Sequence, residues 1–131
     1  MLMVSIWQYK MELYTSCYDK IFLKEKKEND IYIQVSRNLG KYSDTEKVNL
    51  IDEDWGLEFG NWGAANEKEY KSQLSKKDLR IFSNHIRELN NKRIFLLCFE
   101  NVLIGETCHR IWLSKVLARS FGLKFSEYTD S

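Results

Sequence analysis

The chain of 131 residues contains no proline and only three cysteines. An odd number of cysteines cannot pair completely, so we expect no disulfide framework and a reducing, cytoplasmic location. No apolar run approaches the roughly 18 residues that a membrane-spanning helix needs. Residues 1–7 lack the basic lead and the apolar length of a signal peptide. The sequence therefore predicts no membrane partner, and Met11 is an alternative start because a complete strand pattern begins there.

An excess of charge of either sign is also missing. Twenty Lys and Arg against nineteen Asp and Glu give a formal net charge of +1. A domain that binds duplex nucleic acid generally has a strongly basic balance, so the composition does not indicate a nucleic-acid partner. Apolar residues make up 44% of the chain, which suffices for a hydrophobic core. The length suits a single domain over residues 1–131.

Three stretches have the patterns of β-strands. Residues 11–18 and 31–36 alternate between apolar and polar side chains, which predicts strands. Residues 93–99 are almost continuously apolar, which is typical of a strand buried on both faces. We therefore predict that the 93–99 strand is central in the sheet.

The second half of the chain also has helical patterns. Residues 64–74 are weakly helical. Ser75 can then accept a hydrogen bond from the backbone N–H of Asp78, and apolar residues recur at spacings of three and four from Leu79 to Leu89. A further amphipathic helix is predicted over 108–121, with Thr107 as its cap. A left-handed Gly122 is expected to end it.

These elements together predict an α/β domain. We expect a single small Rossmann-like domain with a mainly parallel sheet of three to five strands and flanking helices, the 108–121 helix lying on one face. Residues at about 38–66 contain four of the six glycines and show no clean period. We predict a long, partly ordered flap there, over the sheet edge.

Polar residues gather where the predicted strands end. In open α/β sheets, ligands bind at the carboxyl ends of the strands, beside helix N-termini. The strand ends and the first turn of the last helix supply Thr15, Ser16, Ser36, Arg37, Glu100, Cys108, His109 and Arg110. We expect these side chains to line one pocket. Thr15, Ser16, Ser36, Arg37 and Arg110 are the candidates for holding a small anionic ligand, and Cys108, His109 and Glu100 are the candidates for catalysis.

Arg110 falls in the first turn of a predicted helix, where a positive charge opposes the helix dipole. Two interpretations account for it. The guanidinium can form a salt bridge with Glu100 or Glu106. Alternatively, Arg110, His109 and the free N–H groups of the helix hold a phosphate or a carboxylate.

Cys108 has two interpretations as well. A thiol at a helix N-terminus beside His and Arg has an environment that lowers its pKa, which favours a nucleophile. Cysteine is also among the residues most often buried, and Cys98 in the apolar strand is interpreted as packing. Cys98, Cys108 and His109, together with Cys17, can approach one another, but their spacing matches no zinc signature. We therefore predict no metal and no cofactor.

Residues 93–100, an apolar strand ending in Leu-Cys-x-Glu, are followed by Cys-His-Arg at 108–110. This pair of motifs resembles the family called domain of unknown function 488. Residues 14–16 and 33–37 are similar to that family's first two strand motifs, and Tyr70 lies where the family often has a tyrosine. The resemblance implies an α/β fold and a shared polar cluster, and it implies no reaction. The chain lacks the prolines that the family usually has.

The sequence leaves two main hypotheses open. The first is an enzyme, a hydrolase or transferase acting on a phosphorylated or nucleotide-like small molecule. Cys108 or Glu100 would then serve as nucleophile or base, and His109 as acid or base. The second is a non-catalytic module that senses or sequesters nucleotides at the same site, with Trp55 or Trp62 stacking on a base. A third hypothesis is a protein-interaction domain whose polar cluster is structural.

Overall fold

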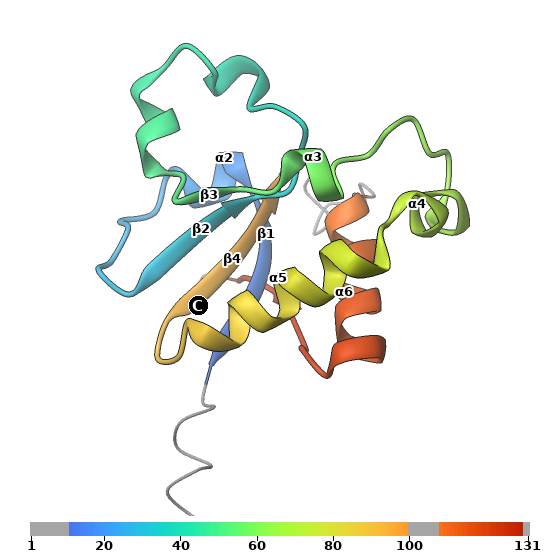
Figure 1. Cartoon of the computed structure of the whole chain (residues 1–131). Coiled ribbons are helices and arrows are strands. Elements are labelled where there is room, and N and C mark those ends of the chain that lie inside the picture. The colour runs from blue at the N-terminus through green and yellow to red at the C-terminus, as the bar shows by residue number, and fades with distance from the viewer. Residues whose placement is uncertain (1–10, 100–107, 130–131) are drawn as a thin grey trace, which may run out of the picture.

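The computed structural model describes residues 11–99 and 108–129. Within them, five parallel strands form one sheet in the order β3-β2-β4-β1-β5 (Figure 1). The strands are β1 (Glu12–Cys17), β2 (Asp30–Gln34), β3 (Glu53–Asp54), β4 (Arg93–Cys98) and β5 (Ser126–Glu127). The predicted α/β class, the parallel sheet and the central position of the 93–99 strand are confirmed.

Strand β4 is buried on both faces and separates two apolar clusters. Ile94 and Leu96 belong to one cluster, whereas Phe95 and Leu97 belong to the other. All four side chains are fully buried. Because successive side chains of a strand point to opposite faces, the continuous apolar run contributes to both clusters.

Helices cover both faces of the sheet. They are α2 (Tyr18–Ile21), α3 (Gly56–Phe59), α4 (Glu67–Gln73), α5 (Lys76–Glu88) and α6 (His109–Phe121). Tyr70 of α4, Phe82 of α5 and Leu113 of α6 join the cluster on one face. On the opposite face, Tyr18 and Ile21 of α2 join the other cluster. Figure 1 shows α5 and α6 together on one side of the sheet. No helix in the described ranges is long and apolar enough to cross a bilayer.

The segment at about 38–66 is more structured than the predicted flap. It contains two short 3₁₀ helices, η1 (Gly40–Tyr42) and η2 (Glu46–Leu50), and then β3 and α3. The carboxylate of Asp52 accepts a hydrogen bond of 2.8 Å from the backbone N–H of Tyr32 in β2. The backbone N–H of Trp55 donates to the Gln34 carbonyl over 2.9 Å. The second half of the segment is therefore an edge of the sheet, which corrects the prediction of a flap over that edge.

The ends of the long helices follow the predicted chemistry in part. The Ser75 hydroxyl accepts a hydrogen bond of 3.2 Å from the Asp78 N–H, so this predicted cap is confirmed. Gly122 has a φ of 71° and ends α6 as predicted. The N-cap of α6 is Cys108, which makes no side-chain capping bond. The predicted cap, Thr107, lies outside the described residues.

Because β4 is buried on both faces, we expect substitutions at two neighbouring positions of this strand to destabilise the protein strongly. Leu96→Ala and Leu97→Ala should each lower the free energy of unfolding by about 2–5 kcal/mol, because each leaves a cavity in a different cluster. Urea denaturation followed by circular dichroism measures both losses. Ile81→Ala is the control, since Ile81 is 49% exposed on α5, and it should cost little. A large loss at only one leucine would contradict burial on both faces.

Candidate functional site

A pocket of about 400 Å³ lies beyond the carboxyl ends of β2 and β4, beside the start of α6. Its lining includes Ser36, Arg37, Cys108 and His109. Thus the structure brings four of the predicted site residues to one pocket. Thr15, Ser16 and Arg110 are not among the lining residues, and Glu100 lies outside the described residues.

Arg37 is an exposed cation of the pocket wall. The central carbon of its guanidinium lies 3.5 Å from the centroid of the Trp62 ring, which places the group over the indole face. Behind its stem, a Cβ added to Gly60 would come within 2.4 Å of Arg37 Cγ, so α3 ends in close contact with this side chain. Among residues 11–99 and 108–129, no carboxylate pairs with Arg37.

Hydrogen bonds hold the Ser36 hydroxyl in place, and one of them comes from Tyr18, which packs on the face of the sheet that α2 covers. Its hydroxyl donates to the carbonyl of Asn38 over 2.7 Å. The hydroxyl of Tyr18, 2.7 Å from Ser36 Oγ, therefore acts as the donor to it. Burial raises the pKa of Tyr18 well above its ordinary value, which keeps this donor protonated. A Cβ at Gly56 would meet the Ser36 carbonyl oxygen at 2.1 Å, so glycine permits α3 to approach this turn.

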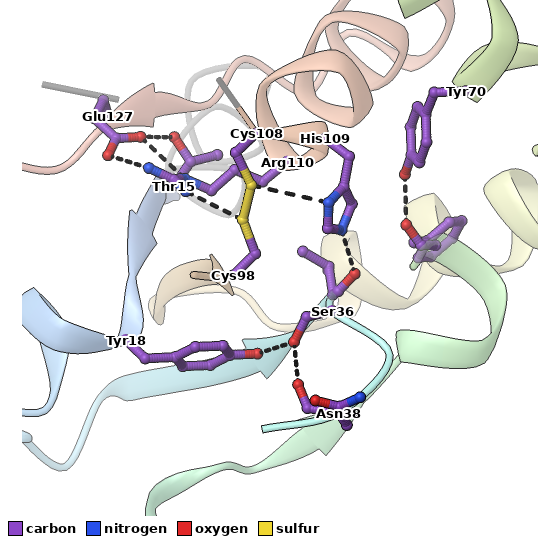
Figure 2. The surroundings of a disulfide bond; sticks show 12 residues. Thr15, Tyr18, Ser36, Asn38, Tyr70, Cys98, Cys108, His109, Arg110 and Glu127 are labelled. Atoms are coloured by element: carbon purple, nitrogen blue, oxygen red, sulfur yellow. Dashed lines mark hydrogen bonds and ion pairs between the residues drawn. A yellow bond between two sulfur atoms is a disulfide. The ribbon is translucent and has the colours of Figure 1, made fainter. Parts of the chain in front are cut away.

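The His109 ring is oriented by the backbone of the segment after β2. Its Nε2 lies 2.7 Å from the carbonyl oxygen of Val35, which can only accept, so Nε2 carries a proton. The other ring nitrogen, Nδ1, faces the sulfur of Cys108 at 3.9 Å (Figure 2). Tyr70 flanks the ring at a centroid distance of 5.5 Å. His109 is therefore fixed between the pocket and the sulfur cluster.

Cys98 and Cys108 are joined by a disulfide at the end of β4 and the start of α6 (Figure 2). Cys17 is buried and free. The odd cysteine count does exclude complete pairing. Cys98 packs in the core as predicted, and the disulfide is an additional bond that was not predicted. The sequence allows Cys98 and Cys108 to approach one another, but their spacing alone does not predict a disulfide, because the sulfur atoms meet only through the fold. The ligand atoms of Cys98, Cys108 and His109 all lie within 4.8 Å of one another, and these residues form a candidate metal-binding group.

Arg110 is fully buried and paired with a residue that sequence reasoning missed. Its Nη2 lies 2.7 Å from the carboxylate of Glu127 in β5, and its Nη1 donates to Cys98 Sγ over 3.1 Å. Thr15 also donates to Glu127, over 2.7 Å (Figure 2). Among the described residues the carboxylate partner of Arg110 is Glu127. The predicted partners, Glu100 and Glu106, lie outside the described residues. A two-residue strand has no sequence period from which this contact can be foreseen.

Ser16 occupies an inner position as well. It is fully buried. Within the part of the chain that the structure describes, its hydroxyl has no hydrogen-bond partner. Thr15 and Ser16 of β1 therefore lie away from the pocket wall, whereas Ser36 and Arg37, which follow β2, form part of it. This division comes from the sheet order, because β1 and β2 lie on opposite sides of β4.

Comparisons of the chain with family models, with curated proteins and with solved structures give no match. The resemblance to the domain of unknown function 488 accordingly stays a prediction.

The buried ion pair predicts a sharp loss of stability when its carboxylate is removed. Glu127→Gln should lower the free energy of unfolding by about 3–5 kcal/mol, because the fully buried Arg110 then loses the negative charge of Glu127. Thermal and urea denaturation measure this loss.

Glu67→Gln is the matched control for that substitution. Glu67 pairs with Lys71 and Lys115 at the protein surface, where ion pairs contribute little to stability. Equal effects of the two substitutions on unfolding would contradict a structural role of the Arg110–Glu127 pair.

Proposed function

We propose that this domain binds a small phosphate-bearing, nucleotide-like molecule in the pocket beyond β2 and β4. The observation that carries the proposal is Arg37, an exposed guanidinium in the pocket wall that has no carboxylate partner among the described residues. A guanidinium presents several N–H donors in a planar fork that matches phosphate oxygens. Stacking on Trp62 orders the side chain before a ligand arrives, which reduces the entropy lost on binding.

The start of α6 adds to the attraction for an anion. Cys108 and His109, the N-cap and first residue of this 13-residue helix, line the pocket. The N-terminus of a helix has a partial positive charge from its unpaired N–H groups. The first turn of α6 contains no acidic residue that would offset it. Phosphate oxygens between Arg37 and this helix end would contact positive charge from two sides.

The remaining wall of the pocket suits the non-phosphate part of such a ligand. Phe99 and Trp112 contribute aromatic surface, and Asn38 contributes a side-chain amide. Aromatic faces can stack on a base or pack against a sugar, and amides form directional hydrogen bonds with them. The volume of about 400 Å³ lies within the range of about 300–1,000 Å³ of small-molecule sites.

The proposal concerns binding, and catalysis is left outside it. A nucleophilic Cys108 needs a free thiolate, whereas its sulfur is joined to Cys98 here. His109 is held through Nε2 by the Val35 carbonyl. These contacts favour the sensing or sequestering module over the hydrolase or transferase.

Calorimetry with inorganic phosphate, pyrophosphate and the mono-, di- and triphosphates of adenosine and guanosine tests the proposal. Arg37→Ala should weaken binding roughly tenfold to more than a hundredfold, because a hydrogen bond to a charged group contributes about 1.5–3 kcal/mol. Arg37→Lys should recover part of the affinity, since it keeps the charge and loses the planar fork.

Arg80→Ala is the matched control, because Arg80 is an exposed arginine on α5 that does not line the pocket. It should leave the affinity unchanged. The proposal fails if none of these probes binds, or if Arg37→Ala binds them as tightly as the unaltered chain does.

A further inference from the structure

We propose that Cys98, Cys108 and His109 form a binding site for a divalent zinc-like metal ion when the two cysteines are reduced. The three side chains come from the end of β4 and the start of α6, and their ligand atoms lie within 4.8 Å of one another. Two thiolates and one imidazole are a ligand set that selects zinc over magnesium or calcium. This proposal does not require that the pocket binds phosphate.

The orientation of His109 is the first supporting observation. Histidines that bind metals almost always donate their other ring N–H to a carboxylate or to a backbone carbonyl. His109 does this through Nε2, 2.7 Å from the Val35 carbonyl oxygen. In the neutral ring the lone pair is then on Nδ1, the nitrogen that faces Cys108 Sγ at 3.9 Å. The ring is thus turned with its metal-binding nitrogen toward the sulfur atoms.

Positive charge lies beside both sulfur atoms. Arg110 Nη1 donates to Cys98 Sγ over 3.1 Å, and Glu127 holds that guanidinium in place. Cys108 is the N-cap of α6, where the helix dipole stabilises negative charge. Arg110, Glu127 and the Val35 carbonyl would therefore form the outer shell of the site.

The backbone leaves room for an ion between the cysteines. Their Cα atoms are 7.4 Å apart, beyond the span of about 4.4–6.8 Å that most disulfides bridge. A metal ion that bonds to each sulfur at about 2.3 Å fits between more widely spaced cysteines. Reduction comes first. A phosphine and water convert the disulfide into two thiols and the phosphine oxide, and the ion then displaces one proton from each thiol.

The fourth coordination position is the chemically useful one. Zinc sites with three protein ligands keep a fourth position for water or substrate. Cys108 and His109 line the pocket, so two of the three ligands lie beside it. A water molecule or an anionic group in the pocket would complete a tetrahedral site.

Cobalt substitution in the full-length chain tests this proposal. The chain is reduced with a phosphine, separated from the reductant under nitrogen and titrated with cobalt(II) in a buffer free of phosphate. We expect a thiolate-to-cobalt charge-transfer band, intense tetrahedral d–d bands and saturation at one ion per chain. Added zinc should displace the cobalt. Absence of the charge-transfer band in the reduced chain, or cysteines that stay oxidised after phosphine treatment, would overturn the proposal.

Substitutions identify the ligands. Cys98→Ser, Cys108→Ser and His109→Gln should each weaken zinc binding at least about tenfold to a hundredfold. Cys17→Ser is the matched control, because Cys17 is the buried free cysteine beside Cys98 in the sheet register, outside the ligand group. It should keep the cobalt spectrum. A spectrum that survives His109→Gln unchanged, or one that Cys17→Ser abolishes, would overturn the assignment.

A measurement on the unaltered chain covers the case in which a ligand variant does not fold. Alkylation of the reduced chain, mapped by mass spectrometry, reports the reactivity of each cysteine. Zinc should slow the alkylation of Cys98 and Cys108 much more than that of Cys17. Equal rates with and without zinc at Cys98 and Cys108 would overturn the proposal.

Discussion

The burial of β4 on both faces is the constraint on which the rest of the structure depends. A strand with apolar side chains on both faces needs a neighbouring strand on each side and a layer of helices over each face. Strands β2 and β1 flank it, and α2 lies opposite to α5 and α6. Because all the strands are parallel, their carboxyl ends meet at one edge. The pocket and the sulfur cluster both lie at this edge, where β4 ends and α6 begins.

A second constraint is the charge of Arg110 in the interior. A fully buried guanidinium requires a carboxylate and further acceptors, since burial removes the water that would otherwise solvate it. Glu127 meets this requirement from β5, and Thr15 stabilises the same carboxylate from β1. The pair thereby connects the start of α6 to the far edge of the sheet. This pair also engages the arginine of the Cys-His-Arg motif, whereas Arg37, on the other side of β4, lies in the pocket wall.

The sequence predicts the long elements because their patterns extend over several turns or residues. The run of β4, the cap at Ser75 and the left-handed Gly122 all lie where local physical chemistry places them. By contrast, β3 and β5 have two residues each, too few for any period. For the candidate site, the sequence predicts the location, which is the edge of the sheet where the parallel strands end. Which side chains face the pocket depends on the sheet order and on Glu127, and neither is visible in a sequence that is read one element at a time.

The pocket and the sulfur cluster share Cys108 and His109, and this sharing couples their chemistry. The Val35 carbonyl that holds His109 belongs to the residue immediately before Ser36 and Arg37. A movement of the His109 ring, when the sulfur atoms separate to accept an ion, would therefore be transmitted to the segment that presents Arg37. That segment is packed closely against Gly56 and Gly60, and tightly packed groups shift together rather than absorb a displacement. An ion bound between the two cysteines would accordingly change the shape of the pocket, through contacts of one or two residues.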